Sequence, residues 1–266
     1  MVNDLVDMKK IILFLIFVWT AQLTFAQSTL KNRLSYGLEV GPEFSGVRGG
    51  GLSAPTGRTS VNGGAFVQYD VSYVLKVSLG AYYDPRGFGT SFKSQFLMLS
   101  DTGYIGYNSF YAYDMAYKAD YITFPLNVTY LSGGTKLRLL VEGGLYFSIM
   151  LTSHKKGYSG FYIDPDDLPH YGDSTLTSGY HIKNYDSPAN DFFNATDVGL
   201  HFAFGLIYQM SDKLALTFKP GFNFGLSAIV SNPEVDMKWD RILKVNLGIV
   251  YKFHPYVKPN KEYILQ

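Results

Sequence analysis

The sequence predicts an all-β fold, an eight-stranded antiparallel up-and-down transmembrane β-barrel. Three observations lead to this prediction. From Leu34 onward, most segments alternate apolar and polar residues with a period of two, as strands of a two-faced sheet do. Only 17% of the 266 residues are charged and 17% are aromatic, whereas about a quarter of an ordinary soluble domain is charged. The segments are joined alternately by long and short connections, which is typical of barrels that cross a membrane.

The N-terminal residues have the pattern of an export signal. A basic region at Met8-Lys9-Lys10 precedes an apolar run over residues 11–19, and the small residues Thr24 and Ala26 stand where cleavage requires them. The run is too short for a membrane-crossing helix, which needs about 20 apolar residues. We therefore expect a cleavable signal peptide over residues 1–26, a barrel over residues 27–253 and a periplasmic tail over residues 254–266.

Eight segments are long enough to cross a membrane as tilted strands. In chain order, strands are expected over residues 34–45, 61–71, 74–84, 122–130, 139–149, 198–209, 214–227 and 243–253. The last segment shows the pattern best, because Leu243, Leu247 and Ile249 share one face while Lys244 lies on the other. Pro125 is an irregular residue in the fourth segment, since proline cannot donate a hydrogen bond to a neighbouring strand.

The connections between these segments predict the orientation of the barrel. Short ones are expected around residues 72–73, 132–135 and 211–213, and long ones over residues 46–60, 85–120, 152–196 and 228–240. Membrane barrels of bacteria have short periplasmic turns and longer external loops. Both termini are therefore expected in the periplasm, and the long loops outside the cell.

A soluble up-and-down barrel such as a lipocalin shows the same alternation and is the alternative. In that fold the large apolar side chains would fill the interior. Eight strands leave a lumen only wide enough for side chains, so several aromatic rings per strand would not fit there. The pattern therefore favours a barrel whose apolar face contacts lipid.

Charged residues on the polar face are expected inside the barrel. This lumen charge network comprises Glu39, Glu43, Lys76, Arg138, Glu142, Lys219 and Lys244, joined by Asp84, Asp197 and Lys252. Charges in a narrow lumen are tolerated when they are paired. The network is then either a salt-bridged plug or a selective ion path. His201 beside Glu142 is either an acid–base group or a hydrogen-bonded lumen residue without a catalytic role.

Two of the expected loops carry notable side chains. The loop over residues 85–120 and the residue after it are rich in tyrosine: Tyr104, Tyr107, Tyr111, Tyr113, Tyr117 and Tyr121. These rings form either an interaction surface or cross-strand pairs in strands that extend above the membrane. The loop over residues 152–196 contains His154, His170, Asp164, Asp166 and Asp167. They suit a rim enzyme or a calcium site, or simply a solvated acidic turn.

Several classes of function find no support in the sequence. There is no cysteine, which excludes disulfides and thiolate metal sites. The formal net charge of +1 offers no field that would attract nucleic acid. No nucleophile-elbow, zinc-protease or phosphate-loop motif occurs. We therefore predict no catalytic residue, no metal site and no cofactor.

Four segments together resemble the PorT-like outer-membrane β-barrel family of Bacteroidetes-type Gram-negative bacteria. They are residues 36–41 (YGLEVG), 121–126 (YITFPL), 141–147 (VEGGLYF) and 247–251 (LGIVY). The resemblance extends over nearly the whole mature chain. It implies an eight-stranded barrel and, for the protein after which the family is named, a part in maturation or export through type IX secretion.

The closing strand also looks like the insertion signal of outer-membrane barrels. Asn246 and Gly248 are followed by apolar residues at alternate places, including Tyr251 and Phe253. The resemblance implies recognition by the barrel assembly machinery. Many such barrels stop at the terminal aromatic residue, whereas here the expected tail over residues 254–266 follows.

The sequence thus predicts a non-enzymatic protein of the outer membrane, exported by its signal peptide, with surface loops for interaction. The resemblance adds an accessory role in protein secretion. A small transport pore and an outer-membrane enzyme are the alternatives. The expected partners are outer-membrane lipid, the barrel assembly machinery, and proteins or glycans at the external loops, but no nucleic acid.

Overall fold

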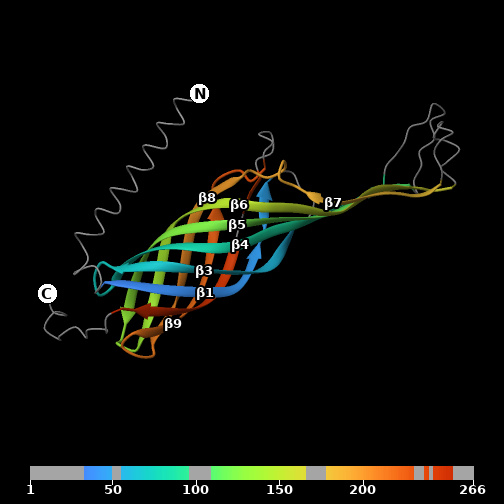
Figure 1. Cartoon of the computed structure of the whole chain (residues 1–266). Coiled ribbons are helices and arrows are strands. Elements are labelled where there is room, and N and C mark those ends of the chain that lie inside the picture. The colour runs from blue at the N-terminus through green and yellow to red at the C-terminus, as the bar shows by residue number, and fades with distance from the viewer. Residues whose placement is uncertain are drawn as a thin grey trace, which may run out of the picture.

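The computed structural model describes residues 33–49, 55–95, 109–165, 178–230, 237–239 and 242–253, which form a β-barrel from which a narrow sheet projects (Figure 1). The expected signal peptide over residues 1–26 and the expected tail over residues 254–266 lie outside the described residues. No helix in the described part of the chain is long and apolar enough to cross a membrane.

Eight antiparallel strands close into a ring, which confirms the predicted fold. The ring strands are β1 (Leu34–Ser45), β3 (Thr56–Asp70), β4 (Leu75–Gln95), β5 (Phe110–Gly133), β6 (Leu137–Ile163), β8 (Thr196–Gln209), β9 (Leu214–Gly225) and β11 (Ile242–Lys252). Their order is β5-β4-β3-β1-β11-β9-β8-β6, and β6 pairs with β5 to close the ring. Three further strands lie outside it, namely β2 (Val47–Gly49), β7 (Gly179–Pro188) and β10 (Met237–Trp239).

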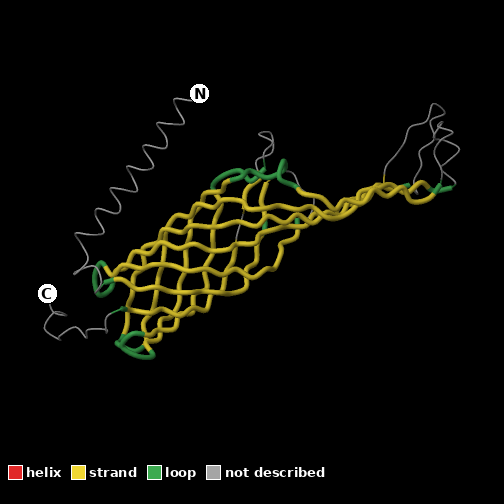
Figure 2. The backbone as a smooth tube through the Cα atoms, viewed as in Figure 1, coloured by secondary structure: helices red, strands yellow, loops and turns green. Residues whose placement is uncertain are grey.

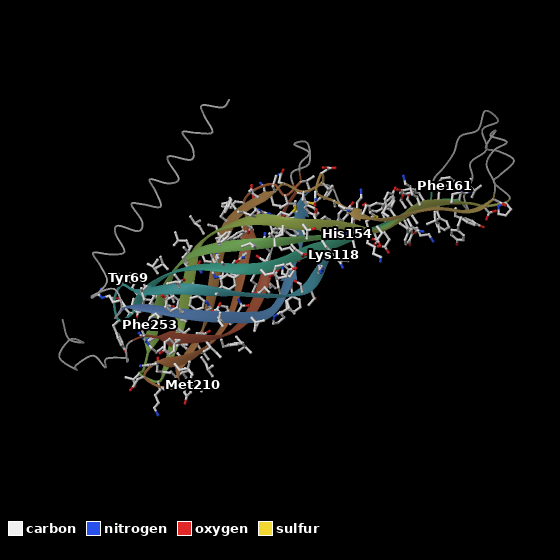
Figure 3. The ribbon with its side chains drawn as sticks, viewed as in Figure 1. Tyr69, Lys118, His154, Phe161, Met210 and Phe253 are labelled. Carbon is white, nitrogen blue, oxygen red and sulfur yellow. The ribbon has the colours of Figure 1, made fainter. Side chains whose placement is uncertain are left out.

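The two faces of the ring have the polarity that a membrane barrel requires. Along β11, Lys244 and Asn246 point into the barrel and are buried, whereas Leu243, Leu247 and Ile249 are about half exposed on the outside. Figure 3 shows outward-pointing side chains, drawn mostly in the white of carbon, around the outer surface of the barrel. An apolar exterior around a polar interior contradicts the soluble-barrel alternative.

Proline residues coincide with gaps in the ladders between strands. Registered pairs are missing where β5 carries Pro125 opposite Gly80 of β4, and where β9 carries Pro220 opposite Phe204 of β8. A third gap lies between β1 and β11 at Pro42. In each case the proline lacks the N–H that the ladder would use, so the irregularity expected at Pro125 is present and recurs elsewhere.

Both described ends of the chain lie at the end of the barrel that carries the short turns. Tyr69, Met210 and Phe253 are together there, whereas Lys118 and His154 lie at the other end (Figure 3). Gly133 adopts a φ of 110° in the turn between β5 and β6, a conformation that favours glycine. By the general rule for these barrels, this end is expected to face the periplasm, and we call it the periplasmic end.

The long connections expected over residues 85–120 and 152–196 are strands for much of their length, with β4, β5 and β6 running on beyond the expected strand ends. Strands β5 and β6 have 24 and 27 residues, more than twice the roughly 9–11 that one crossing needs. Above the barrel, β4, β5, β6 and β7 form a twisted sheet that projects outward (Figure 2). Because both faces of this part meet water, its residues lose the polar–apolar alternation that marks the membrane-crossing parts.

Candidate functional site: a filled lumen and a projecting sheet

A fully buried arginine, Arg86 of β4, organises the outer half of the lumen. Its Nη1 lies 2.5 Å from Oδ2 of Asp197, and its Nη2 lies 2.8 Å from Oδ2 of Asp84. Nη2 also donates to the hydroxyls of Thr123 at 3.1 Å and Ser148 at 2.9 Å. The cation is therefore held between two buried carboxylates from opposite parts of the ring, which is how a charge is tolerated away from water.

Sequence reasoning missed Arg86 because the residue fell within an expected loop. The available signal was its spacing from Asp84, since residues two apart on a strand share a face. Three aromatic rings surround the guanidinium, with Cζ 4.7 Å from the Tyr121 centroid, 5.3 Å from that of Tyr146 and 5.7 Å from that of Trp239. The site therefore combines ion pairing with cation–π contact.

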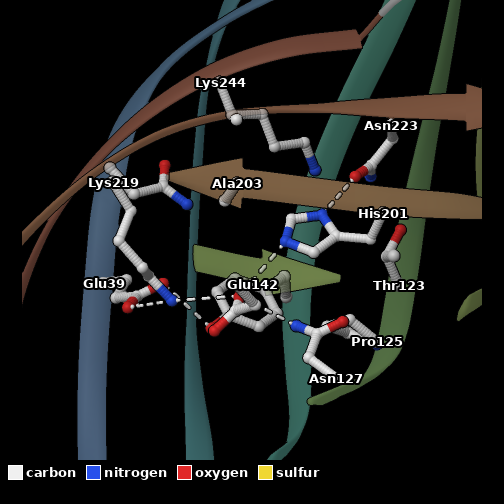
Figure 4. A pocket seen from close by; sticks show the side chains of 13 residues that line it. Glu39, Thr123, Pro125, Asn127, Glu142, His201, Ala203, Lys219, Asn223 and Lys244 are labelled. Atoms are coloured by element: carbon white, nitrogen blue, oxygen red, sulfur yellow. Dashed lines mark hydrogen bonds and ion pairs between the residues drawn. The ribbon is translucent and has the colours of Figure 1, made fainter. Parts of the chain in front are cut away.

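A second ionic group lies deeper in the lumen, around Lys219 of β9 (Figure 4). Its Nζ is 2.7 Å from Oε1 of Glu39 and 3.4 Å from Oε1 of Glu142. His201 places Nε2 3.1 Å from the same Glu142 oxygen and Nδ1 2.6 Å from Oδ1 of Asn223. Both histidine nitrogens are thus engaged within a cavity of about 30 Å³, which has room for roughly two water molecules.

Lys244 of β11 pairs with the Arg86 group and also lines the cavity beside Lys219 and His201. Its Nζ lies 2.9 Å from Oδ2 of Asp84 and 3.5 Å from Oε2 of Glu43. The structure therefore pairs five of the expected network residues in two neighbouring groups: Lys219 with Glu39 and Glu142 in one, and Lys244 with Glu43 in the other.

The remaining two, Lys76 and Arg138, lie near the periplasmic end and make other contacts. Lys76 pairs with Asp70 at 2.6 Å. Arg138 donates to the carbonyl oxygen of Tyr73 at 2.9 Å and stacks on the ring of the same residue. Both side chains are buried, but they lie apart from the other five, because alternation predicts which face a residue occupies and not its height along the barrel.

The residues of the expected insertion signal divide between the two faces of β11. Asn246 and Gly248 face the lumen, and Tyr251 and Phe253 are exposed on the outside. Phe253 contacts Tyr36 edge to face, with ring centroids 5.0 Å apart. These rings lie on the outside at the end of the barrel that carries the short turns, a position at which barrels of this kind carry an aromatic girdle.

An apolar plug covers the Arg86 group at the outer mouth. The short strands β2 and β10 pair with each other there and contribute to a buried cluster. Its members are Val47, Phe88, Ala119, Tyr121, Ala189, Phe193, Ile229, Val230, Met237, Trp239 and Ile242. Within the described residues, the lumen is thus filled by ion pairs and capped by apolar side chains.

Above this plug, four strands form what we call the projecting sheet: residues 87–95 of β4, 110–118 of β5, 154–163 of β6, and β7. Its outer face continues the membrane-facing side of the barrel and its inner face continues the lumen side. A row of rings from Phe110, Tyr162 and Tyr180 crosses the outer face, with Phe110 and Tyr162 stacked 5.3 Å apart. Lys93 lies 3.9 Å from the Phe110 centroid.

The tyrosines expected in the second loop lie on β5 where the structure describes them. Tyr117 stacks on Phe88 and Phe192, and its hydroxyl is 2.9 Å from that of Tyr113. Burial and this hydrogen bond raise the pKa of Tyr113 above its ordinary value. Strand extension with cross-strand packing is therefore the interpretation that the structure supports. Tyr104 and Tyr107 lie outside the described residues.

His154 lies at the base of the projecting sheet, on its outer face. Its Nε2 is 2.5 Å from Oδ1 of Asp186, and Nζ of Lys156 is 3.3 Å from Oδ2 of the same carboxylate. Hydrogen bonds from these two residues lower the pKa of Asp186. Among the described residues, no group of three or more potential ligands could hold a metal ion; His170, Asp166 and Asp167 lie outside them.

Comparison with known proteins gives one family and several distant structures. Residues 25–231 match the outer membrane protein beta-barrel domain. The outer membrane protein OprG from Pseudomonas aeruginosa is 11% identical with a TM-score of 0.42, covering 83% of this chain and 97% of OprG. Neisserial surface protein A is 11% identical with a TM-score of 0.40, covering 82% and 96%. No curated protein matches the sequence.

Proposed function

Since the chain belongs to the outer membrane protein beta-barrel domain family, we propose that it is a closed, non-enzymatic barrel that carries the projecting sheet as an interaction surface outside the cell. In line with its PorT-like sequence segments, we further propose that it serves as an accessory of protein secretion. Its partners at that surface are proteins or glycans, and the barrel is the support that holds the sheet above the membrane.

The filled lumen is the observation that carries this proposal. Arg86, Asp84 and Asp197 are fully buried and mutually paired, and Lys219 and Lys244 extend the pairing across the barrel. A hydrated ion could pass only if these pairs separated, and breaking a buried pair costs about 3–5 kcal/mol. The plug above them would have to move as well. These contacts favour support and display over transport.

Conductance in planar lipid bilayers tests the closed lumen. The mature protein is refolded in detergent, and its folding is checked by a shift in gel migration on boiling. We expect no discrete channels from the folded protein. Regular single-channel steps, altered in size by Arg86→Met, would instead establish the transport alternative.

The secretory role is tested in cells. A strain that lacks the chain should release less of its secreted protein into the medium, and the complete chain should restore that release. A chain without the projecting sheet should reach the outer membrane but fail to restore it. Full restoration by the truncated chain would contradict the proposed use of the sheet. A hydrolytic or acyl-transfer activity lost in His154→Ala would favour the enzyme alternative.

A further inference from the structure

Strand β7 gives the projecting sheet a free edge. In the barrel, one side of β6 pairs with β8 over residues 137–149; above it, the same side pairs with β7 over residues 154–163. On its far side, β7 has no partner strand among the described residues. Its ten residues continue in one register with β6, without a bulge. Such an edge offers a row of backbone donors and acceptors to another strand.

The inner face beside this edge is positively charged. Lys183 of β7 and Lys155 of β6 both approach the ring of Tyr185, at 5.4 and 5.8 Å from its centroid. The pairing registers of the four strands show which residues share this face, and the described ones include no aspartate or glutamate. His181 lies on the same face, stacked on Phe161 at 4.8 Å. On this face, the side chains of an added strand would meet cationic side chains that no aspartate or glutamate of the same face already neutralises.

The outer face beside the edge is apolar toward the tip. The side chain of Tyr180 is 69% exposed and that of Ile182 is 55% exposed. Toward the base, the same face carries Asp186, which is already paired with His154 and Lys156. A strand lying along β7 would therefore place alternate side chains against two different surfaces, one cationic and one apolar.

We infer that the β7 edge binds an extended segment of a partner protein as an additional strand of the projecting sheet. The segment would alternate acidic residues, facing Lys183 and Lys155, with apolar residues, facing Tyr180 and Ile182. Main-chain hydrogen bonds supply affinity in this mode of recognition, and the alternate side chains supply specificity. This inference rests on the proposed display function and names the class of its partner.

Fluorescence anisotropy with two labelled peptides tests the inference. The probes are twelve-residue peptides that alternate valine with glutamate or valine with lysine, added to the mature protein folded in a neutral detergent. We expect saturable binding of the Val/Glu peptide alone. The double variant Lys155→Glu and Lys183→Glu should weaken that binding by about tenfold and confer binding of the Val/Lys peptide, because cross-strand charge pairs change sign.

Two proline variants test the edge itself. Consecutive N–H groups point to opposite sides of a strand, so one of Lys183→Pro and Asn184→Pro removes a donor from the open edge and the other removes a donor facing β6. Hydrogen exchange of β6 and β7 identifies which variant keeps the sheet intact. That variant should lose peptide binding, and the alanine variant at the same residue, Lys183→Ala or Asn184→Ala, serves as its matched control.

The remaining outcomes are distinguishable. The inference is overturned if neither peptide binds, or if Val/Glu binding survives both the charge reversal and the sheet-preserving proline. It is also overturned if light scattering finds a dimer that the same proline variant dissociates, because the β7 edge would then bind a second copy of this chain. These results leave the closed lumen untouched, since conductance tests it separately. If cells need the projecting sheet for secretion but the proline variant still supports secretion, the display function is retained and strand addition is rejected.

Discussion

Among single residues, Arg86 has the largest expected effect on stability. It neutralises Asp84 and Asp197 in a part of the lumen without solvent exposure. Arg86→Met should lower the free energy of unfolding by about 3–5 kcal/mol, because buried Asp197 loses its counterion and buried Asp84 keeps only Lys244. Urea unfolding in detergent, followed by the fluorescence of Trp239 beside this group, measures the loss.

A compensated variant provides the control for Arg86. Combining Arg86→Met with Asp84→Asn and Asp197→Asn removes the cation together with both anions. It should recover part of the lost stability, because it leaves neither carboxylate unpaired and Lys244 keeps Glu43 as its partner. If the triple variant were as unstable as the single one, packing of the arginine side chain rather than charge pairing would explain the loss.

Glycine is required at position 37 by an aromatic ring. A Cβ built on Gly37 would lie 2.2 Å from Cζ of Phe66, whose ring covers the glycine from the next strand. Gly37→Ala should therefore lower the free energy of unfolding by about 1–3 kcal/mol, the usual cost of overpacking. Gly46, where a Cβ meets no atom within 4 Å, is the matched control; an equal loss at Gly46→Ala would contradict the steric explanation.

For single residues, the sequence predicts which face of the barrel a side chain occupies better than it predicts the ion-pair partners of that side chain. Period-two alternation places Glu39, Glu142 and Lys219 inside the barrel, and the structure joins them in one group. The same alternation places Lys76 inside, yet Lys76 pairs near the periplasmic end. Pairing depends on the stagger of neighbouring strands, which a single strand's pattern does not contain. Arg86 was missed for a related reason, because its strand continues past the last clear alternation.

Among the elements, β7 depends on a charged anchor at its base. The pKa of Asp186 is lowered from its ordinary value of 3.8 by hydrogen bonds from His154 and Lys156. A carboxylate with a lowered folded-state pKa stabilises the fold above its unfolded pKa, and the contribution disappears as pH falls through the folded value. Hydrogen exchange of residues 184–188 should therefore accelerate as pH falls below about 4, after correction for the intrinsic rate.

Asp186→Asn isolates this effect. The variant should exchange faster than the wild-type protein at pH 7 and should lose the additional acceleration in acid. High salt should reduce the difference, because the pair is exposed to solvent. An acid response of equal size in both proteins would show that another group controls the opening of β7.

The elements also show where sequence prediction failed. Strands were predicted well where one face meets lipid and the other meets the lumen, as in β1, for which the expected residues 34–45 agree with Leu34–Ser45. In the projecting sheet both faces meet water, so apolar and polar residues need not alternate. Strand β7 lies outside the eight-stranded ring, and the eight strands expected from the sequence do not include it.

For the whole molecule, barrel and projecting sheet should be separable. The ring closes through pairs below the plug, including those of residues 137–149 of β6 with β8. Replacing residues 90–115 and 157–185 with short turns should therefore leave the heat-dependent gel shift intact and the urea midpoint nearly unchanged. A truncated protein that no longer folds in detergent would show that the projecting sheet contributes to the stability of the barrel.

The continuity of β4, β5 and β6 through the membrane affects how the molecule responds to mechanical load. These strands run without interruption from the barrel wall to the projecting sheet (Figure 1). A tension applied at the tip along the strands would act on many inter-strand hydrogen bonds in shear and at the same time, instead of opening them one by one. A partner that pulls on the tip would thus transmit its force to the embedded wall, and the sheet would behave as a stiff lever fixed in the outer membrane.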